Sequence, residues 1–305
     1  MELPTEIKSL YRHWERHLLS TQPRQSLIEQ FSDPKFFLQI EQFILERTAI
    51  WKSKQINQTP YTQDPILSKY RFCNIFRELD KQTITFHKLL NPLRDDFPLW
   101  LMNMFMCRMI ARPETIEQIG LLSFDESTNN HWMNSLLNTP IPKYGNAYVF
   151  PISTIQNSST PTREQFLAQH LPAVIKLVAK EISTWNKQSV FDGIQKIFPI
   201  FGFNHSFLWT EVLIDVAYQF PDKIDLFTRF PIGPGSLPTI KQINSSVDSS
   251  LIVSNLAKGF IDLDLTVNNV PLRLSAENWE GIGCEFRKYT NLSAGHGRKR
   301  LYYKK

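Results

Sequence analysis

The stretch from Trp51 to Thr83 constrains the fold more than any other part of the chain. Apolar side chains recur there, and just beyond it, at steps of four and three residues, together with one threonine: Phe72, Phe76, Leu79, Thr83, Phe86 and Leu90. This spacing is one face of an amphipathic helix, so we predict a helix over residues 67–90. Thr62 and Asp64 are candidate helix caps, and Pro65 suits a first helical turn.

Three polar residues, Asn74, Arg77 and Asp80, are each three positions apart on the margin of that apolar face. On a helix, residues at this spacing are neighbours. An Asn, an Arg and an Asp at the edge of an apolar face indicate a helix that meets a cleft, which makes them candidate site residues. The alternative is a surface ion pair, which contributes little to stability.

Helical patterns dominate the rest of the chain. Of its 305 residues 42% are hydrophobic and 12% are aromatic, enough for a large core, and its eleven glycines are few. We predict an all-α fold with at most a short β hairpin. The expected organisation is one helical domain of two lobes, residues 1–140 and 163–305, joined by an irregular connection at 141–162. The expected helices are 2–20, 34–53, 67–90, 98–112, 113–122, 127–137, 162–185, 189–198, 204–220, 247–260 and 276–292.

Several functional classes are disfavoured by what the sequence lacks. No apolar run approaches 18 residues, so we expect no membrane span, and the first residues have no apolar signal region. The cysteines Cys73, Cys107 and Cys284 are far apart, which is typical of a reducing, intracellular compartment. The histidines show no metal-ligand spacing, so no metal site is predicted.

The segment from Ser189 to Phe220 has the pattern of a helix-hairpin-helix. A short helix is expected to end at Phe198, followed by a hairpin with Gly202 and a long second helix. Such a turn can present backbone N–H groups to a phosphate. Glu211 and Asp215 share one face of the second helix, which is otherwise almost entirely apolar. They face either a cation, water or substrate, or a thin strip of solvent.

The cations that could bind phosphate do not belong to a P-loop. No GxxxxGK[ST] or GxSxG motif occurs, and Gly233 to Ser236 is too short for a nucleotide loop, so we expect a turn there. Arg71, Arg77 and Arg108 are the clustered candidates. Arg108 interrupts an apolar run and needs an anionic partner, either an internal carboxylate or a phosphate-bearing ligand.

The chain ends in a basic segment. From Gly281 onward it holds seven basic residues against one acid, Glu285: Arg287, Lys288, Arg298, Lys299, Arg300, Lys304 and Lys305. Mixed with tyrosines, this composition suits a polyanion such as nucleic acid. The alternative is a solubilising tail.

Taken in order, these motifs resemble one family, the α-glutamyl/putrescinyl thymine pyrophosphorylases, which share a helical domain with the 5-hydroxymethyluracil DNA kinases. The resemblance covers roughly Arg47 to Tyr303. It rests on the residues 50–52, 64–67, 70–74, Arg77 to Asp80, Thr83, Arg108, 114–115, 147–148, Pro151, 207–208, Glu211, Asp215, 233–235, 284–286, 288–289 and 297–298. The chain departs from the family pattern at His205, Ser206, Asn146 and Ala111, which puts substrate specificity and full activity in question.

The resemblance implies a fold related to helix-hairpin-helix DNA glycosylases and an enzyme that hypermodifies thymine in DNA. In the family scheme a kinase produces a pyrophosphorylated 5-hydroxymethyluracil base, and the pyrophosphorylase displaces diphosphate with an amine such as putrescine or an amino acid. The missing P-loop favours the second step. DNA carrying modified thymine, a small amine and a 5-hydroxymethyluracil DNA kinase are the implied partners. No cofactor is predicted, and a divalent metal for the diphosphate is left open.

Roles for individual residues follow as hypotheses. Asp80, Glu211 or Asp215 would deprotonate the amine, and Arg71, Arg77 and Arg108 would bind the diphosphate. Asn74 is a further catalytic candidate. The candidates for gripping the base or strand are Trp51, Tyr70, Tyr148 and Trp209. The candidates for DNA contact are Gly202, Gly233, Gly235, Arg287, Lys288, Arg298, Lys299 and Arg300. The alternatives are a DNA-glycosylase-like repair enzyme, in which Asp215 could serve, and a non-catalytic binder of modified DNA.

Overall fold

The structure, a computed structural model, describes residues 14–15, 23–145, 160, 162–201, 206–267, 269–297 and 301. Its regular structure is mostly helical, as predicted, with a few two-residue strands. The chain forms two compact units, one built from Tyr11–Asp80 with Leu226–Lys305, the other from Lys81–Asp225. We call these unit 1 and unit 2. Their borders lie at Asp80/Lys81 and Asp225/Leu226, positions other than the expected connection at 141–162.

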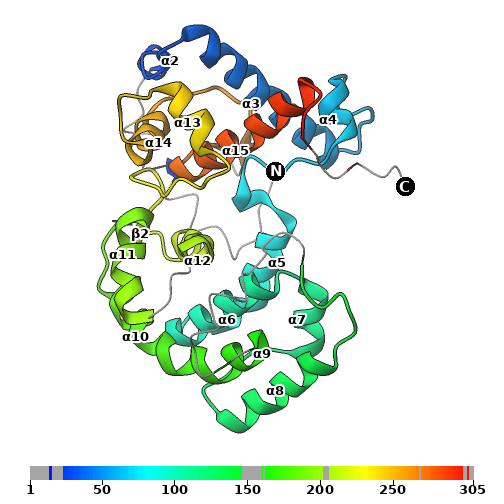
Figure 1. Cartoon of the computed structure of the whole chain (residues 1–305), viewed down its shortest axis with the longest axis vertical. Coiled ribbons are helices and arrows are strands. Elements are labelled where there is room, and N and C mark those ends of the chain that lie inside the picture. The colour runs from blue at the N-terminus through cyan, green and yellow to red at the C-terminus, as the bar shows by residue number, and fades with distance from the viewer. Residues whose placement is uncertain are drawn as a thin grey trace. The chain divides into compact units, whose positions relative to one another are not determined.

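Unit 1 joins the two ends of the chain, coloured blue to cyan and yellow to red in Figure 1. Its elements are α2 (Arg24–Ile28), α3 (Pro34–Gln55), α4 (Pro65–Lys69), the 3₁₀ helix Arg77–Leu79, α13 (Leu237–Ile243), α14 (Ser249–Lys258), β3 (Thr266–Val267), β4 (Val270–Pro271) and α15 (Ala276–Ser293). Helices α13 and α14 pack against α15. Edge-to-face contacts of Phe36 and Phe43 with Phe286, at centroid distances of 5.8 and 5.5 Å, join α3 to α15.

Unit 2 is built around the apolar helix α6. Its elements are α5 (Lys81–Leu90), the 3₁₀ helix Asn91–Leu93, α6 (Phe97–Ile110), α7 (Pro113–Ile119), α8 (Glu126–Asn138), α9 (Arg163–Gln165), the π-helix Phe166–His170, α10 (Leu171–Ser183), β1 (Gln188–Ser189), α11 (Val190–Phe201), α12 (Ser206–Gln219) and β2 (Ile224–Asp225). Helix α6 packs against α10 and α12, and every residue from Trp100 to Ile110 is buried. A helix that is apolar all round must be buried in this way.

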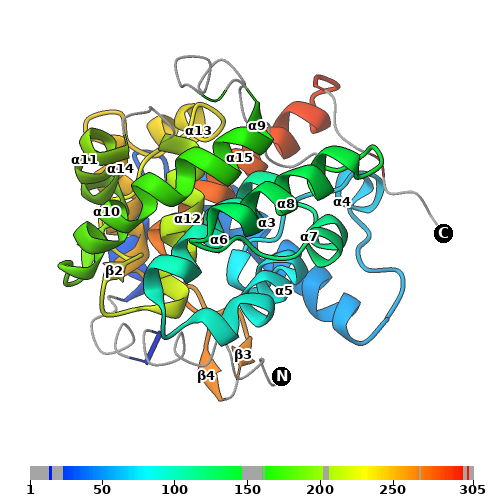
Figure 2. The ribbon, with the colours of Figure 1, turned by 90° about the horizontal axis from the view of Figure 1, so that it is seen from below.

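Both pairs of strands are minimal. β3 and β4 form an antiparallel hairpin, visible beside each other in Figure 2, with Val267 opposite Val270. β1 and β2 form a parallel pair in unit 2, with Gln188 opposite Ile224. The expectation of at most one short hairpin therefore missed the parallel pair.

The long helix predicted over residues 67–90 is wrong in its middle. Helix α4 ends at Lys69, the chain is extended or irregular through Phe76, and α5 begins only at Lys81. The apolar positions of the predicted face are nevertheless buried. Phe, Cys and Asn have weak helix propensity, and the backbone of this segment makes hydrogen bonds elsewhere in unit 1. The predicted cap and first turn are confirmed, because Asp64 caps Ile66 and Leu67 and Pro65 occupies the first turn, although α4 begins two residues before the predicted Leu67.

Other boundaries also differ from the expectation. Helix α11 continues through Pro199 to Phe201, so it does not end at Phe198 before a hairpin. The turn at Gly233 leads directly into a helix, α13, that the sequence pattern did not reveal, and α2 was likewise missed. The expected N-terminal helix lies mostly outside the described residues.

Among the described residues no single helix is long and apolar enough to cross a membrane. Helices α11 and α12 are long and apolar enough only when they are counted as one segment. They are bent by 118° relative to each other, and the residues that join them lie outside the described part of the chain.

Candidate functional site

A buried ion pair, Arg108 with Asp215, lies at the centre of unit 2. Arg108 on α6 donates from Nε to Asp215 Oδ2 at 2.5 Å and from Nη2 to Oδ1 at 2.6 Å. The two side chains are 1% and 0% exposed. This bidentate geometry is the strongest that a guanidinium and a carboxylate can form. The anionic partner that the sequence required for Arg108 is thus an internal carboxylate, one of the two alternatives.

The ion pair extends into a chain of hydrogen bonds between α5 and α12. His87 Nε2 lies 2.9 Å from Asp215 Oδ1, and Gln219 Nε2 lies 3.1 Å from His87 Nδ1. Arg108 Nη2 also donates to the hydroxyl of Thr83 at 3.1 Å. All five side chains are buried. Because buried polar groups are costly unless they are paired, this network fixes how α5, α6 and α12 pack together.

Glu211 and Asp215 do not face solvent. Both carboxylates are buried, Glu211 at 8% exposure and Asp215 at 0%, which excludes the strip of solvent that the sequence left open. Asp215 meets the Arg108 cation instead, which is one of the partners that the other alternative allowed. In this arrangement Asp215 has both oxygens engaged by Arg108 and His87, so a role as the nucleophile or base of a glycosylase would need the network to open.

In unit 1, the segment from Tyr70 to Asp80 lies against α15. Arg47 on α3 donates from Nη2 to the carbonyl oxygens of Cys73 at 2.8 Å and Phe72 at 3.4 Å. The Cys73 N–H donates to Glu285 Oε2 at 2.9 Å. These bonds occupy backbone groups that a helix would have used, which explains why the predicted helix is interrupted here.

A second link between this segment and α15 is made by Asn278. Its side-chain amide donates to Glu78 Oε2 at 3.4 Å and to Glu277 Oε2 at 2.8 Å. Asn278 also completes a capping box with Ser275 at the start of α15. Two motifs that lie about 200 residues apart in sequence, 70–80 and 275–289, are therefore neighbours in unit 1.

The predicted catalytic residues of this segment do not share a helical edge. Arg77 is buried within the 3₁₀ helix, Asp80 follows that helix and is half-buried, and Asn74 lies in the irregular stretch before it. Arg71 is exposed. The helical spacing that made Asn74, Arg77 and Asp80 neighbours is thus absent, because residues 70–76 are not helical. Asn74, Arg77 and Asp80 belong to unit 1, whereas Arg108, Glu211 and Asp215 belong to unit 2.

The predicted DNA-contacting residues near Gly233 have internal partners. The Gly233 N–H donates to Glu280 Oε1 at 3.1 Å, so it is not presented outward to a phosphate. A side chain at Gly235 would meet the Cys284 sulfur at 2.8 Å, which requires glycine there. Arg287 Nη1 donates to the Pro234 carbonyl at 3.2 Å, tying α15 to this turn.

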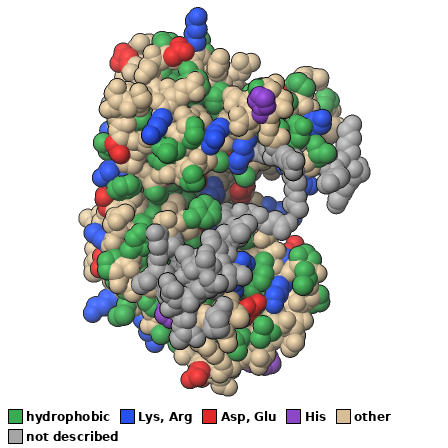
Figure 3. Space-filling view, viewed as in Figure 1, with side chains coloured by type: hydrophobic (Ala, Val, Ile, Leu, Met, Phe, Trp, Pro, Cys, Tyr) green, Lys and Arg blue, Asp and Glu red, His purple; other side chains and the backbone are tan. Residues whose placement is uncertain are grey.

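Lys288 is the exposed cation of the same helix. It donates to Glu285 Oε1 at 2.6 Å. Partial burial lowers the pKa of Lys288, but the Glu285 charge and hydrogen bond outweigh burial and raise the pKa above its ordinary value, so Lys288 is protonated at neutral pH. Lysine and arginine side chains lie over the part of unit 1 that holds α13 to α15 in Figure 3. This face can meet a polyanion.

The predicted stacking aromatics differ in their surroundings. Trp209 is fully buried, with ring centroids 5.1 Å from Phe105 and 5.1 Å from Phe201, so it is a core residue and cannot stack on a base in this conformation. Trp51 on α3 and Tyr70 after α4 are half-buried. Tyr70 pairs through its backbone with Leu301, which brings one residue of the basic end to unit 1.

Several expected residues lie outside the described part of the chain: Asn146, Tyr148, Gly202, His205, Arg298, Lys299 and Arg300. Of the other departures, Ser206 begins α12, and Ala111 ends α6 with φ 52°, in the left-handed region. Asn and Gly tolerate that conformation better than Ala does.

Sequence reasoning missed several residues of these networks. Arg47, His87 and Asn278 were not singled out, although Thr83 and His87 are four apart on one face of α5, a spacing that could have indicated a polar pair. In the part of the chain that the structure describes, no group of three or more His, Cys, Asp or Glu side chains could hold a metal ion.

Comparison with known proteins places the chain in a family. A profile described as "5-hmdU DNA kinase, helical domain" matches residues 34–298. A protein of Bacillus phage SP10 named 5-hmdU DNA kinase is 25% identical over 331 aligned positions, which cover 94% of this chain and 51% of the phage protein. The chain thus spans about half the length of this curated relative. No solved structure matches. Both networks described above lie within the matched residues, and the chain belongs to the family of the 5-hmdU DNA kinase helical domain.

Proposed function

We propose that this protein acts on hypermodified thymine in DNA and exchanges the diphosphate of a pyrophosphorylated 5-hydroxymethyluracil base for an amine. The observation that carries the proposal is the match of residues 34–298 to the helical domain of 5-hmdU DNA kinase, with no P-loop motif in the 305 residues. The match is to a helical domain, and the reaction in this proposal is taken from the pyrophosphorylase resemblance.

The proposed reaction is a substitution at the exocyclic methylene carbon of the base. The amine nitrogen attacks this carbon and forms a C–N bond, while the C–O bond to the diphosphate breaks and the diphosphate leaves with the electron pair. The nitrogen then loses a proton to a carboxylate. A cation beside the leaving group stabilises its charge, and a base in reach of the amine accepts the proton.

In unit 1, Arg77 and Asp80 are our candidates for these two roles. Arg77 is buried and Asp80 is half-buried at the end of the same 3₁₀ helix, which is held on α15 through Glu78 and Asn278. Unit 2 contributes rigidity in this proposal, because the Arg108–Asp215–His87 network fixes three helices. Arg71, which is exposed, is a further candidate for phosphate contact.

Mass spectrometry of nucleosides tests the proposal. DNA carrying pyrophosphorylated 5-hydroxymethyluracil is incubated with the protein and a panel of amines, then digested. We expect a new base whose mass equals replacement of diphosphate by one amine. Asp80→Asn and Arg77→Lys should each reduce the rate by about 100-fold or more, the scale of losing a general base or a charge-stabilising group. Asp95→Asn, an exposed change in unit 2, is the matched control and should keep the wild-type rate.

Three other results, two of which need a binding measurement or an added ATP reaction, point to other functions. Release of free base without an amine requirement would indicate a glycosylase. Tight binding without any product would indicate a non-catalytic reader of modified DNA. Addition of phosphate to 5-hydroxymethyluracil DNA in the presence of ATP would indicate kinase activity. Each of these three results would overturn amine transfer as the function.

A further inference from the structure

The loop formed by residues 139–145, which follows α8 in unit 2, presents an apolar side chain to solvent. Ile141 is 91% exposed, the highest value among the large apolar side chains that the structure describes, and Ile56 follows at 70%. Single exposed apolar residues are common on protein surfaces. Ile141 differs from most of them because Pro140 and Pro142 flank it. Each proline fixes its own φ, and the second also restricts the backbone of Ile141.

Hydrogen bonds to two neighbouring helices hold the ends of this loop. At its start the Thr139 hydroxyl donates to the Ser135 carbonyl oxygen of α8 at 2.9 Å. At its end the Gly145 N–H donates to the Ile110 carbonyl oxygen of α6 at 2.8 Å. A Cβ at Gly145 would collide with the Ala111 carbonyl oxygen, so only glycine allows this close approach. The loop therefore starts and ends at fixed points.

Cationic side chains anchor the middle of the loop. Arg112 Nη1 donates to the Pro142 carbonyl oxygen. Lys143 Nζ donates to the Leu136 carbonyl oxygen of α8 at 3.2 Å. A partner that contacts Ile141 thus meets a loop that is already ordered, so little conformational entropy is lost on binding.

Glu164 supports the loop from below and is charged. It is buried, and its carboxylate accepts from the Tyr144 hydroxyl at 2.6 Å and from Lys143 at 3.0 Å. Burial alone would raise the pKa of Glu164, but the two hydrogen bonds outweigh burial and lower the pKa below its ordinary value. Arg163, one residue earlier, lies over the Tyr144 ring, with its guanidinium carbon 4.9 Å from the ring centroid.

The charges around the loop favour an anionic partner. Three cations, Arg112, Lys143 and Arg163, face two acids, Glu164 and Glu114, the second of which lies 3.6 Å from Arg112. Three positive charges against two negative charges leave an excess of one positive charge. A surface of this kind attracts phosphate groups.

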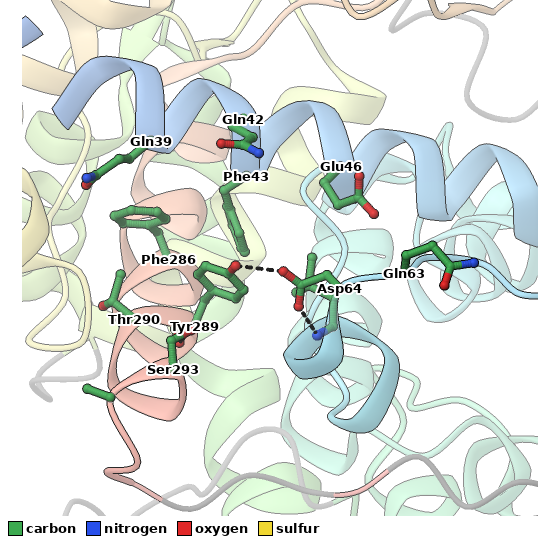
Figure 4. Close-up of a pocket in the computed structure, with 12 residues that line it drawn as sticks. Gln39, Gln42, Phe43, Glu46, Gln63, Asp64, Phe286, Tyr289, Thr290 and Ser293 are labelled. Carbon is green, nitrogen blue, oxygen red and sulfur yellow. Dashed lines mark hydrogen bonds between the residues drawn. The ribbon is translucent and has the colours of Figure 1, made fainter. Parts of the chain in front are cut away.

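The groove between α3 and α15 in unit 1 has the opposite character. Its volume is about 690 Å³, and Glu46 and Asp64 both line it (Figure 4). None of the described residues that line this groove is a Lys, Arg or His. A negatively charged groove repels the phosphate backbone of a nucleic acid. The 139–145 loop is therefore better suited to DNA than this groove is.

An exposed isoleucine beside cations matches one known way of contacting duplex DNA. Proteins that bend DNA insert apolar side chains between base steps, which unstacks the bases in part and kinks the duplex. The inserted side chain loses its contact with water, and this burial offsets part of the cost of unstacking. A single isoleucine between two prolines is too small to form the apolar core of a stable protein interface.

We propose that Ile141 is a wedge that inserts between base pairs of duplex DNA, while the cations around the loop contact the phosphate backbone. The choice of DNA as the partner rests on the proposed function. The exposure of Ile141, the rigidity of its loop and the charges beside it are properties of unit 2 alone.

Fluorescence anisotropy with the full chain tests the wedge. The probes are a duplex that carries pyrophosphorylated 5-hydroxymethyluracil and the modified strand alone. Ile141→Ala should weaken duplex binding by about tenfold, the scale of losing most of the burial of an isoleucine side chain. Binding of the single strand should not change, because a single strand has no base pairs to open. Ile141→Leu keeps the apolar volume and should keep the duplex affinity.

The matched control is Ile56→Ala, which shortens another exposed isoleucine and should bind both probes as the wild type does. A second measurement uses 2-aminopurine, a base whose fluorescence rises when it loses stacking. Placed at successive positions beside the modified base, it should brighten when wild-type protein or Ile141→Leu binds, and brighten less with saturating Ile141→Ala. Because Ile141 is exposed, its variants should fold, which circular dichroism checks.

Equal duplex binding and equal 2-aminopurine fluorescence for Ile141→Ala and Ile56→Ala would overturn the wedge. An equal loss of affinity for both probes would also overturn it. Loss of self-association in Ile141→Ala, measured by analytical ultracentrifugation with DNA binding intact, would assign Ile141 to a contact between copies of the chain instead.

The wedge and the proposed function fail in different ways. Unstacking that depends on Ile141, without amine transfer to DNA, would overturn the proposed reaction and keep the wedge. Amine transfer with unchanged unstacking in Ile141→Ala would keep the reaction and overturn the wedge. Wild-type protein that binds neither probe would overturn both.

Discussion

At the scale of single residues, the stability of unit 2 depends on the ion pair between Arg108 and Asp215. Both side chains are essentially inaccessible, and the guanidinium donates two hydrogen bonds to the carboxylate. Desolvating two charges is costly, so the pair is stable only while both partners are present. His87 and Thr83 form hydrogen bonds with the same pair, so the packing of α5, α6 and α12 depends on it.

We therefore expect Asp215→Asn to destabilise the protein by about 3–5 kcal/mol, because it leaves the Arg108 guanidinium buried without its counter-charge. Urea denaturation followed by circular dichroism measures the free energy of unfolding. Asp95→Asn, an exposed change in the same unit, should alter it by less than about 0.5 kcal/mol.

The double variant Arg108→Met with Asp215→Leu tests whether the lost stability comes from the unpaired charge. Apolar side chains of similar length remove both charges together, so the loss should be smaller than for Asp215→Asn alone. A cost below about 1 kcal/mol for Asp215→Asn would contradict a buried, water-free pair.

At the scale of elements, the segment between α4 and α5 shows why a strong sequence pattern can still be misread. Its apolar residues follow a helical period and are buried, yet residues 70–76 are not helical. Arg47 donates hydrogen bonds to the carbonyl oxygens of Phe72 and Cys73. The Cys73 N–H donates to Glu285, which lies 212 residues away in the sequence. Local periodicity contains no information about such distant partners.

Arg47→Met tests this anchoring. Methionine keeps much of the aliphatic packing of Arg47 but removes its hydrogen bonds to Phe72 and Cys73. We expect faster amide hydrogen exchange in peptides covering residues 70–80, because the segment loses the contacts that hold it on α3. Arg24→Met, which removes a partly exposed cation paired with Glu41, is the control and should leave that exchange unchanged. Unchanged exchange in Arg47→Met would show that packing alone holds the segment.

Elements with both a cap and an apolar face were predicted well. Helix α3 begins at Pro34 after the Asp33 cap, and α15 begins at Ala276 after Ser275, each within a residue of the expected start. The short helices α2 and α13 were missed because five to seven residues give too little periodicity to detect.

Within the candidate site, the sequence predicted an anionic partner for Arg108 and left open whether Asp215 meets a cation, water, a substrate or solvent, so it did not show that the two residues meet. That pairing joins residues 107 positions apart in the chain and depends on the packing of α6 against α12. Trp209 shows the converse, since an aromatic residue in an apolar helix has the same sequence appearance whether it is buried or binds a base. Burial, which the sequence does not specify, distinguishes the two.

At the scale of the whole molecule, net charge is the property that bears on the proposed binding of DNA. The net charge is +5, and the residues Arg298, Lys299, Arg300, Lys304 and Lys305 together account for five positive charges. Leu301, within this basic end, pairs with Tyr70 in unit 1. Replacing the basic residues while keeping Leu301 therefore removes the positive charge and leaves the backbone pairing with Tyr70 in place.

Replacing those five residues with glutamine, which lowers the net charge from +5 to 0, should weaken DNA binding and reduce its dependence on salt. Each phosphate contact that is lost lowers the slope of log K against log salt by about 0.9 for duplex DNA. Fluorescence anisotropy at several salt concentrations measures both quantities. The matched control replaces five exposed lysines elsewhere with glutamine and also gives a net charge of 0: Lys81, Lys88, Lys180, Lys187 and Lys258. A larger loss in the first variant locates the contact at the basic end, whereas equal losses would show that only net charge matters and that the end is a solubilising segment.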